Sequence, residues 1–464
     1  MSETIETSAP EPTPASPARR TAGFLGLAIA SFLGCVDLTI VTTALPSITH
    51  DLDTSLGVAQ LVLSAFLTAL AMFMVTAGRL GDHLGRKQTL LIGIAVFVLA
   101  SVGAALSPSV GPLVVARFVQ GAACAILYTG TSTLVETLFP AGARGRAVGR
   151  LYAVNGVGLA LGPVLGGLLV PAFGWAAVFW INVPFGVAAL AAIAVAVPAP
   201  APSPRVGLDL PGQALVAVTV AALVAVASLP ETTGRLSTPV VIAVVLAVLG
   251  AAATAVVERR ARTPLLRLAL FTHPRFRVAL ASDFFLAVFY ASALLVLPPY
   301  LADRHALDVR ATGLLLLLVS ATMALTSPRV GRWVDRNGPT LPLKWGFGAF
   351  AGTAVLVVVG ALSGSLPALL IGFVFFGAGW ALILAPATLA ALSAVDADES
   401  GFAVGASWTF HNLGGALGAA VAAGLYAAPG PQTGLARVGV VLLLAAIVGL
   451  LANLLITRST QAER

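Results

Sequence analysis

The chain has 464 residues, of which 58% are hydrophobic and only 10% are charged, and its mean hydropathy is +0.98. Because about a quarter of the residues of a soluble domain are charged, this composition excludes an ordinary water-soluble fold. The net charge of +7 does not indicate nucleic-acid binding, since the basic residues lie in short loops between apolar segments. We therefore expect an all-α integral membrane protein.

Few residues are suited to metal or cofactor chemistry. Cys35 and Cys124 lie in separate apolar runs, and we interpret both as small buried side chains rather than metal ligands. No loop carries the G-x₄-G-K-[ST] pattern that binds nucleotide phosphates, so we do not expect ATP to be the direct energy source. The longest loop, near residues 258–275, is too short for a catalytic domain. The sequence thus predicts no cofactor, no metal and no enzyme.

The chain begins with residues 1–21, which are rich in Pro, Ser, Thr and Glu and lack an apolar core followed by a cleavage site. We expect a disordered cytoplasmic tail there rather than a removable signal peptide. A helix needs about 20 apolar residues to cross the hydrocarbon core, and fourteen stretches qualify. They are approximately 22–45, 57–77, 88–107, 110–133, 146–170, 174–197, 210–229, 238–257, 276–301, 311–330, 341–362, 367–391, 402–427 and 435–457.

These spans predict two bundles of six helices with an extra pair between them. We expect an N-terminal six-helix bundle at 22–197, a linker with two extra transmembrane helices at 198–258 and a C-terminal six-helix bundle at 276–457. A basic cytoplasmic loop is expected at 259–275 and a cytoplasmic tail at 458–464. The Ala/Val-rich pair is the least distinctive part, and a twelve-span interpretation would omit it.

The distribution of basic residues tests the number of spans. If the N-terminus is cytoplasmic and the sides alternate, only four of the 26 Lys and Arg residues fall outside, namely Arg235, Arg304, Arg310 and Arg437. Arg117 lies within a span, and all the others are on the cytoplasmic side. Cytoplasmic loops of membrane proteins carry an excess of Lys and Arg. The asymmetry supports an even number of spans with both termini in the cytoplasm.

Two ionisable side chains lie in the first and fourth spans. Asp37 and Arg117, which is followed by Gln120, are both roughly 10–12 Å below the outer ends of their spans at 1.5 Å per residue. A buried guanidinium costs about 2.5–3.5 kcal/mol on insertion scales and tends to mark a functional path. An acid and a base at one depth can pair when Asp37 is ionised, and protonation of Asp37 would release Arg117. The alternatives are an Arg117 side chain that reaches the outer interface and a static ion pair with Asp37.

The segment after the second span, Gly78 to Lys87, predicts a charged cytoplasmic turn. Gly78 and Gly85 permit a tight reversal between helices. Asp82 can cap the N-terminus of the following helix or pair with an Arg of a neighbouring helix, while Arg86 and Lys87 keep the turn in the cytoplasm. An ordinary charged turn with no further role is the alternative.

The same spacing of glycine and aspartate recurs in the second half of the chain. The pattern Gly-x₃-Asp-x₂-Gly occupies Gly78–Gly85 and again Gly331–Gly338, so that Asp335 lies 253 residues after Asp82. Repeated halves that flank a site near the middle of the bilayer are a recurrent architecture of transporters. Neither channels nor membrane-bound enzymes require it.

The fifth span is rich in glycine and contains one proline. Gly158, Gly162, Gly166 and Gly167 allow close approach of a neighbouring helix, and Pro163 can bend the span at that contact. Small-residue packing of this kind occurs in many helical bundles. By itself the pattern therefore predicts a close helix contact rather than a particular function.

Three further polar residues in apolar runs are candidates for binding protons or substrate. Asp283 lies about a third of the way along the ninth span, His411 lies nearer the middle of the thirteenth, and Asn155 begins the glycine-rich part of the fifth. Gln120, close to Arg117, is a fourth candidate. A structural histidine is as plausible for His411 as a functional one.

Together these motifs resemble those of the major facilitator superfamily. Residues 78–87 match its G-x-L-x-D-x-x-G-R-K/R signature, and residues 117–121 are similar to its R-x-x-Q-G motif. Residues 36–46 resemble the L-D-x-T-I-V-N-x-A-L-P pattern of the fourteen-span drug:proton antiporter branch. Residues 158–167 resemble the antiporter signature of the superfamily, and residues 408–418 resemble the R-Q-x-G-G-A-x-G stretch of that branch.

Several positions depart from these patterns. Val36 and Thr43 differ from the branch pattern in the first span, His83 stands where an Arg is common, and His411-Asn412 replace Arg-Gln. The resemblance implies the major-facilitator fold and a role for Arg117 in proton coupling. Protonation of Asp37 would then release Arg117.

We interpret the chain as a proton-coupled antiporter that exports drugs, antibiotics or other small amphipathic molecules by alternating access. Its expected partners are a small-molecule substrate, protons and the lipid bilayer, with no nucleic acid, and we expect a monomer in the plasma membrane. One alternative is a facilitator or importer of a small metabolite on the same fold, without obligatory proton exchange. A second, of another class, is a non-transporting membrane sensor or lipid-handling protein.

Overall fold

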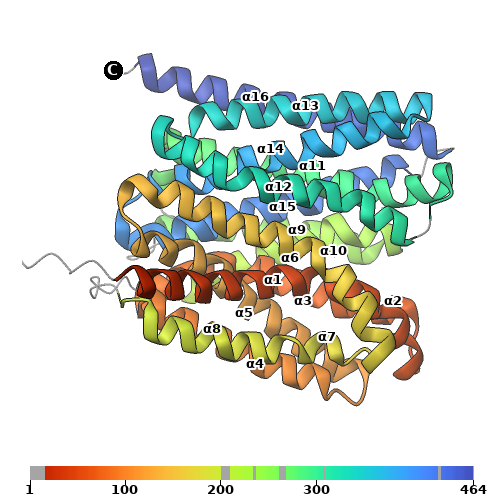
Figure 1. The fold of residues 1–464 in the computed structure, drawn as a ribbon, viewed down its shortest axis with the longest axis horizontal. Helices are drawn as coiled ribbons and strands as arrows, with labels where there is room; N and C mark the ends of the chain where they lie inside the picture. Colours follow the sequence, from red (N-terminus) through yellow and green to blue (C-terminus); the bar gives the residue numbers. More distant parts are fainter. Residues whose placement is uncertain are drawn as a thin grey trace, which may run out of the picture.

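The computed structural model is built from long helices that run along the longest axis of the molecule (Figure 1). Without water in the hydrocarbon core, a chain must satisfy its backbone hydrogen bonds internally, and a helix does so within one segment. All regular elements in the described part of the chain are helices. The structure describes residues 16–199, 210–233, 237–260, 268–307, 309–426 and 430–462.

The N-terminal bundle contains six helices of membrane length, the last of which is interrupted. The interruption at Ile181 separates a short helix from a longer one, and both belong to the same span. A further single turn, α2 (Leu56–Ala59), precedes the second long helix. The bundle consists of α1 (Pro17–Asp51), α3 (Leu61–Leu84), α4 (Arg86–Ala105), α5 (Val110–Leu138), α6 (Arg144–Phe173), α7 (Ala177–Trp180) and α8 (Asn182–Ala196).

The C-terminal bundle repeats this arrangement and lies above the N-terminal bundle in Figure 1. Short 3₁₀ turns precede its first and fifth helices at Leu268–Thr272 and Ala397–Glu399. The bundle consists of α11 (Pro274–His305), α12 (Val309–Asn337), α13 (Thr340–Ser363), α14 (Leu366–Leu392), α15 (Ser400–Tyr426) and α16 (Pro431–Ala462).

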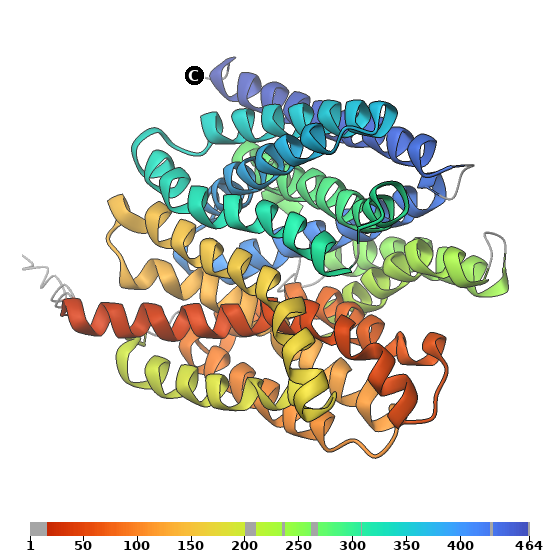
Figure 2. The same cartoon turned by 45° about the vertical axis from the view of Figure 1, so that its right-hand side comes forward.

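The extra pair, α9 (Leu210–Thr233) and α10 (Thr238–Arg260), packs together beside the boundary between the bundles. In Figure 2 the pair, in light green, projects from the side of the molecule. Helix α9 contacts both α3 and α15, where Val216 and Val220 join an apolar cluster that includes Val75 and Ala406. The pair therefore covers one edge of the boundary and leaves the two six-helix bundles intact.

With α7 and α8 taken as one span, the described residues contain fourteen helices of membrane length, as the sequence predicts. Twelve of them are long and apolar enough to cross a bilayer by composition alone, and α10 is among these. The two exceptions have simple causes. The apolar part of α9 that the structure describes is limited to Pro211–Val226, and the middle of α15 carries the polar His411 and Asn412.

Several helices extend beyond the apolar runs that predict them. Helix α1 begins at Pro17 and α16 continues to Ala462, so the inner parts of both expected tails are helical. Residues 1–15 and 463–464 lie outside the described residues, as do 200–209 of the linker and 261–267 of the basic loop. The turn predicted within Gly78–Lys87 is present but is shorter than expected, because α3 runs to Leu84 and α4 begins at Arg86.

The reversal between α3 and α4 is made by Gly85 alone, whose φ of 94° lies in the region that favours glycine. The charged motif therefore forms the ends of two helices rather than a loop.

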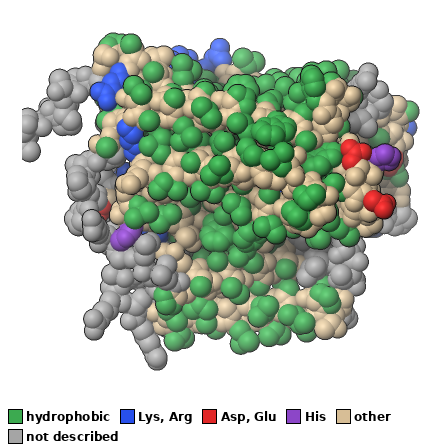
Figure 3. Space-filling view, turned by 90° about the horizontal axis from the view of Figure 1, so that it is seen from below, with side chains coloured by type: hydrophobic (Ala, Val, Ile, Leu, Met, Phe, Trp, Pro, Cys, Tyr) green, Lys and Arg blue, Asp and Glu red, His purple; other side chains and the backbone are tan. Residues whose placement is uncertain are grey.

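We call the side of the molecule where α1 begins and α16 ends the termini side, and the opposite side the far side. The reversal at Gly85 lies on the termini side. In Figure 3 hydrophobic side chains form a broad belt between the two ends of the molecule, and most of the visible charges lie at those ends.

The two bundles meet along two pairs of helices, α6 with α12 and α3 with α15. Both contacts are made by glycines on the termini side, where a Cβ at Gly149 would be 2.5 Å from the Ser327 carbonyl oxygen and one at Gly405 2.5 Å from the Met74 carbonyl oxygen. Such close backbone contact excludes solvent from this part of the boundary. Toward the far side the helices separate around a cavity.

Candidate functional site

A buried ion pair joins α1 to α5 inside the N-terminal bundle. Arg117 Nη1 donates to Asp37 Oδ2, and both residues are at most 1% exposed. The same guanidinium donates from Nη1 to Gln120 Oε1 at 3.0 Å and from Nε to the Val62 carbonyl oxygen at 3.2 Å. The structure therefore places together the acid and the base that sequence depth places at the same level, and it excludes an Arg117 that reaches the interface.

The second carboxylate oxygen of Asp37 is also occupied. Asn182, the first residue of α8, donates from Nδ2 to Asp37 Oδ1 at 3.0 Å and to Ser101 Oγ at 3.3 Å. Gln120 Nε2 donates to the same Ser101 hydroxyl at 2.7 Å and closes the network. The side-chain carbonyl oxygen of Asn182 is buried and accepts no hydrogen bond from the described residues. The break between α7 and α8 thus positions an amide directly at the ion pair.

Aromatic rings complete the surroundings of the guanidinium. Its Cζ atom lies 4.1 Å from the centroid of the Phe66 ring and 5.7 Å from that of Phe179. A cation over a ring face is attracted by the ring quadrupole, and the attraction is larger when water is excluded. Arg117 therefore retains favourable contacts that do not depend on the charge of Asp37.

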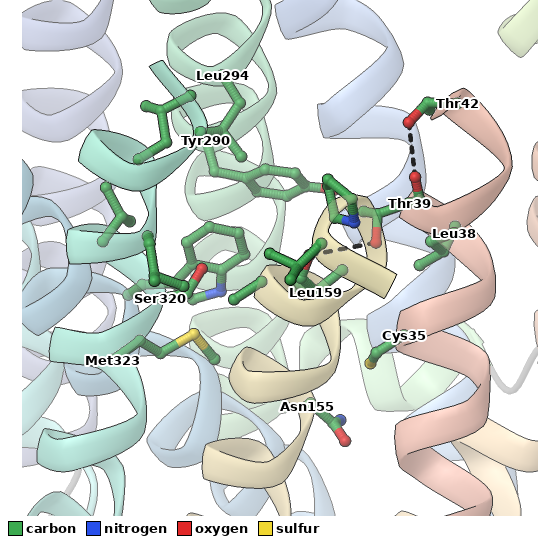
Figure 4. A pocket seen from close by; sticks show the side chains of 18 of the residues that line it. Cys35, Leu38, Thr39, Thr42, Asn155, Leu159, Tyr290, Leu294, Ser320 and Met323 are labelled. Atoms are coloured by element: carbon green, nitrogen blue, oxygen red, sulfur yellow. Dashed lines mark hydrogen bonds between the residues drawn. The ribbon is translucent and has the colours of Figure 1, made fainter. Parts of the chain in front are cut away.

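A cavity of about 1230 Å³ lies between the two bundles. It is lined by α1, α3, α5 and α6 on one side and by α11, α12, α14 and α15 on the other. In Figure 4 Asn155 and Met323 lie at one end of the cavity and Thr42 and Leu294 near the other, and the Tyr290 ring extends from α11 toward Thr39 on α1. We refer to this cavity as the pocket.

The pocket reaches the far side of the molecule. Two of its lining residues in the far-side halves of α6 and α12, Leu168 and Leu314, are each 66% exposed. At the opposite end, Asn155 is 4% exposed and its Oδ1 accepts from Ser31 Oγ at 2.7 Å. Below it, Tyr152 and Thr388 join the two bundles through a hydrogen bond of 2.8 Å between their hydroxyl groups. The pocket is therefore open to the far side and closed toward the termini side.

Helix α1 separates the pocket from the ion pair. The pocket is lined by Cys35, Leu38, Thr39, Thr42 and Thr43, residues at helical spacing on one face of α1. The buried acid of the same helix is absent from that face and contacts α5 and α8 instead. A change at either site can therefore reach the other through the position of one helix.

The glycine-rich face of α6 packs directly on α1. A Cβ at Gly162 would collide with the side chain of Thr39, and one at Gly166 with that of Thr43. A Cβ at Gly158 would be 3.0 Å from Cys35 Cβ. These three glycines thus form the close helix contact that the sequence predicts.

The other two residues of the motif do not take part in that contact. Gly167 has no atom within 4 Å of a Cβ position, and both Gly167 and Pro163 line the pocket. Helix α6 runs from Arg144 to Phe173 without interruption at Pro163.

On the termini side, two carboxylates connect the bundles. Asp82 at the end of α3 accepts from the backbone N–H of Gly401 at 3.1 Å and of Phe402 at 3.0 Å, at the start of α15. Arg86 pairs with the same carboxylate at 3.4 Å. Asp82 thus caps the start of α15 in the other bundle and not the following helix α4. The predicted pairing with an Arg is made with Arg86 of α4.

Asp335 makes the equivalent contact in the other direction. Its carboxylate accepts from the backbone N–H of Gly145 at 2.6 Å and of Arg146 at 2.9 Å, at the start of α6. The glycines of the motif permit both approaches, because a Cβ at Gly78 would collide with the Gly401 carbonyl oxygen and one at Gly331 with that of Gly145. We call the two aspartate contacts together the latch.

Lys87, the last residue of the motif, lies outside the latch and donates from Nζ to the carbonyl oxygen of Ala194 in α8 at 2.8 Å.

Asp283 and His411 have different surroundings. His411 lines the pocket, stacks on Tyr290 and is 5% exposed, and its Nδ1 atom has no hydrogen-bond partner among the described residues. Asp283 is 3% exposed and does not line the pocket; its Oδ2 accepts from the Ser407 hydroxyl, and its Oδ1 accepts from no described residue. Gln120 also lies away from the pocket, in the network of Arg117. Of the four polar candidates, only His411 and Asn155 line the pocket.

The sequence gives no predicted role to Asn182, Ser101, Trp380 or Tyr290, although the structure places all four at the ion pair or the pocket. Asn182 lies inside an apolar span, between Ile181 and Val183, and a polar residue in such a position is a usable signal. The aromatic residues have no comparable signal, because Trp and Tyr are common inside apolar helices that simply pack together.

Two six-helix bundles around a pocket that is closed on one side have the architecture of a membrane transporter with alternating access. A family profile described as Major Facilitator Superfamily matches residues 27–419 and 279–463. The chain is 32% identical over 401 residues to multidrug resistance protein Stp of Mycobacterium tuberculosis, an alignment that covers 86% of this chain and 74% of that protein. The chain belongs to the Major Facilitator Superfamily.

Other relatives of known name support this assignment. The tetracenomycin C resistance and export protein of Streptomyces glaucescens is 32% identical over 400 residues, covering 86% of this chain and 74% of its own length. The drug efflux pump JefA of Mycobacterium tuberculosis is 29% identical, with 85% and 78% covered. The crystal structure of the human organic anion transporter MFSD10 (TETRAN) matches with a TM-score of 0.65, at 18% identity, over 94% of this chain and 100% of that chain. That likeness concerns the fold alone.

Proposed function

We propose that this protein is a proton-coupled antiporter that exports drugs, antibiotics or other small amphipathic molecules from the cytoplasm. In this proposal it lies in the plasma membrane with both termini in the cytoplasm, so that the far side is external. The observation that carries the proposal is the buried pair of Asp37 and Arg117 on the face of α1 opposite the pocket. Ionisable side chains at this depth in a membrane are costly to insert, and those that occur tend to mark functional sites.

The proposed coupling begins at the carboxylate. When Asp37 is ionised, it holds Arg117 through Oδ2 and accepts from Asn182 through Oδ1. Protonation removes the attraction between the charges, but Arg117 keeps its bonds to Gln120 and Val62 and its contact with Phe66. The guanidinium therefore stays with α5 and α3, and α1 becomes free to move relative to them.

The amide of Asn182 suits both states of the carboxyl group. In the described state its N–H donates to the carboxylate, and its carbonyl oxygen has no partner among the described residues. Rotation of the amide by half a turn presents that carbonyl oxygen to a protonated Asp37, which then donates to it. The amide thus donates to the ionised carboxylate and accepts from the protonated carboxyl group.

Movement of α1 is transmitted to the pocket by close packing. Gly162 and Gly166 of α6 have no side chains of their own and pack directly on Thr39 and Thr43 of α1, so α1 and α6 move together. The start of α6 is held by Asp335 of the latch, which must release when the termini side opens. A proton that enters from the external side thus biases the molecule toward the cytoplasmic-open state, in which substrate enters the pocket.

The direction of transport is supported by relatives whose names describe resistance, efflux or export. The glycine-rich motif of α6 supports antiport, because residues 158–167 resemble the antiporter signature of the superfamily. Three of its glycines, within residues 158–166, pack directly on α1, the helix that carries Asp37. The alternative without proton exchange is a facilitator on the same fold.

Replacement of Asp37 by Asn separates the two functions. In inverted vesicles with an imposed proton gradient, we test a panel of cationic, anionic and uncharged compounds for uphill movement and for quenching of a pH-sensitive dye. An antiporter with Asp37→Asn loses uphill movement and retains exchange of substrate for substrate. A facilitator with the same substitution transports as before, and that result would overturn the proposal.

A further inference from the structure

A second acid, Asp283 on α11, is buried in the C-terminal bundle without a cation beside it. It is 3% exposed, and its Oδ2 accepts from the Ser407 hydroxyl of α15. Its Oδ1 is buried and has no hydrogen-bond partner among the described residues. None of the described Lys, Arg and His side chains forms an ion pair with it. The immediate surroundings of this carboxyl group are therefore neutral.

Asp37 shows what an ionised carboxylate requires inside this protein. One of its oxygens accepts from the guanidinium of Arg117 and the other from the amide of Asn182. An ionised Asp283 would have one neutral hydroxyl donor and one oxygen without any donor. Burial of a charge without a partner is costly, and a buried carboxyl group avoids that cost by holding a proton. Asp283 is therefore neutral in the state in which the pocket is open to the far side.

The two acids lie at different depths. With the offset of 253 residues between the halves of the chain, Asp283 corresponds to Ala30 of α1, seven residues before Asp37. At 1.5 Å per residue, Asp283 is therefore about 10 Å nearer the termini side. Its partner Ser407 directly precedes Trp408, which lines the pocket. The carboxyl group thus lies at the closed end of the pocket.

The closed end of the pocket is also where the two bundles are joined. Tyr152 of α6, which bonds to Thr388 of α14 across the boundary, is close enough to Asp283 to interact with it electrostatically. When the termini side opens, α6 and α14 must separate, which breaks this bond and admits water to the closed end. A hydrated carboxylate no longer needs its proton, because water replaces the missing partners.

Helix α15 connects Asp283 to the latch. The helix packs closely on α11, because a Cβ at Gly414 would collide with the carbonyl oxygen of Phe284, the residue after Asp283. The first N–H groups of the same helix are held by Asp82. In the N-terminal bundle α6 likewise packs on the acid-bearing α1 through glycines and is held at its start by the latch. Each bundle therefore has a glycine-rich helix that joins a buried acid to the latch.

We propose that Asp283 is a second proton-binding site of the transport cycle, occupied while the pocket is open to the far side and empty while the termini side is open. Release breaks the O–H bond of the carboxyl group, passes the proton to water on the termini side and leaves a carboxylate. This inference rests on the proposed proton-coupled export and adds a proton carried by the C-terminal bundle to the one carried at Asp37.

Infrared spectroscopy of the purified full-length protein tests whether Asp283 holds a proton. The carbonyl stretch of a protonated carboxyl group lies apart from the bands of carboxylates and amides, so subtraction of the Asp283→Asn spectrum isolates it. At neutral pH, in a detergent without ester groups, we expect the unmodified protein to show a band that Asp283→Asn lacks. Asp303→Asn removes an exposed acid near the far-side end of the same helix, and this matched control should retain the band.

A second variant provides a readout that does not depend on removal of the acid. Ser407→Ala takes away the hydroxyl group that bonds to Asp283. We expect the band to remain but to move in frequency, because hydrogen bonding to a carboxyl group changes its carbonyl stretch. A band that is the same in Ser407→Ala would not belong to Asp283.

Release is tested by closing the far side. Leu168 and Leu314 line the far-side part of the pocket on α6 and α12, and cysteines at both positions are joined by a short bifunctional methanethiosulfonate. The protein lacks Cys35 and Cys124, and the control is the same protein with each new cysteine capped by methyl methanethiosulfonate. We expect the Asp283 band in the capped protein and its loss in the cross-linked protein.

The inference is overturned if Asp283→Asn removes no carboxyl band, or if the band is equally strong in the cross-linked and the capped protein. Both measurements are made without substrate and without a proton gradient. Either negative result therefore leaves uphill export through Asp37 standing, as measured in the vesicle panel. Unchanged transport by Asp37→Asn overturns the proposed function instead, whatever the infrared spectrum shows.

Discussion

Asp82 and Asp335 hold equivalent positions in the two halves of the molecule, each at the end of a helix and each bonded to the start of a helix in the other bundle. Each carboxylate accepts two backbone N–H groups, from Gly401 and Phe402 in one case and from Gly145 and Arg146 in the other. A helix N-terminus attracts negative charge and has unsatisfied N–H donors. The repeat in the sequence is therefore a repeat of one contact between bundles, and the contact can form only while the termini side is closed.

Removal of either latch charge should favour opening on the termini side. Asp82→Asn or Asp335→Asn loses a charge at a helix N-terminus, an interaction of about 0.3–2 kcal/mol, so we expect the equilibrium to shift by roughly two- to thirtyfold per substitution. The shift is measured by labelling of a cysteine at exposed, pocket-lining Leu314 with an impermeant reagent from the far side, in a background without Cys35 and Cys124. Labelling should decrease in both variants. Unchanged labelling would mean that the latch does not contribute to closure.

The contact between α6 and α1 is tested by a matched pair of substitutions. Gly162→Ala places a methyl group against Thr39 and 3.0 Å from the Ile40 amide nitrogen, whereas Gly348→Ala, on α13 and away from the pocket, has no atom within 4 Å of the added Cβ. Overpacking of a close contact costs about 1–3 kcal/mol, so we expect Gly162→Ala to reduce proton-driven efflux by roughly fivefold or more. Gly348→Ala should transport normally. Equal rates for the two variants, at equal amounts of protein in the vesicles, would exclude a role for the close contact in coupling.

Asp283→Asn tests whether the second buried acid binds a proton or a substrate. The residue does not line the pocket, so we expect ligand affinity to remain within about twofold. If Asp283 carries a proton in each cycle, its loss lowers the highest accumulation of substrate by about tenfold per unit of imposed pH difference, since one proton and one pH unit correspond to 1.36 kcal/mol. The measurement is the steady-state accumulation ratio in vesicles. An unchanged ratio would assign Asp283 a purely structural role with Ser407.

How much of this arrangement the sequence predicts depends on the kind of signal. Apolar length gives all fourteen helices, including α9 and α10, because lipid leaves a spanning chain few alternatives to a helix. Depth along two helices puts Asp37 and Arg117 at the same level, since both helices cross the same bilayer, and the structure joins them. The turn predicted within Gly78–Lys87 is confined to Gly85, because polarity marks the edge of the membrane and not the end of a helix.

Contacts between distant segments carry no comparable signal. The sequence shows that Asp82 is repeated at Asp335, but only the fold reveals that their partners are the helix starts at Gly401 and Gly145. Trp380 is similar, since nothing in its own helix distinguishes a packed indole from one that lines a pocket. Residues of the candidate site can thus be predicted from their depth in a span or from a sequence motif. Their partners on other helices cannot, because those depend on which helices meet in the fold.

The proposed amide switch at Asn182 leads to a last prediction. Asn182→Leu keeps the size of the side chain but removes the donor to Asp37 and the carbonyl oxygen that a protonated Asp37 needs. A hydrogen bond to a charged group contributes about 1.5–3 kcal/mol, so we expect proton-driven efflux to fall by roughly ten- to a hundredfold, while substrate exchange without a gradient continues. Asn453→Leu is the matched control, because it removes another buried asparagine, which donates to Ser282 in the C-terminal bundle, without contacting the ion pair. If Asn182→Leu and Asn453→Leu reduce efflux and exchange to the same extent, the asparagine at the ion pair contributes to stability alone, and coupling must be assigned to Asp37 and Arg117 without it.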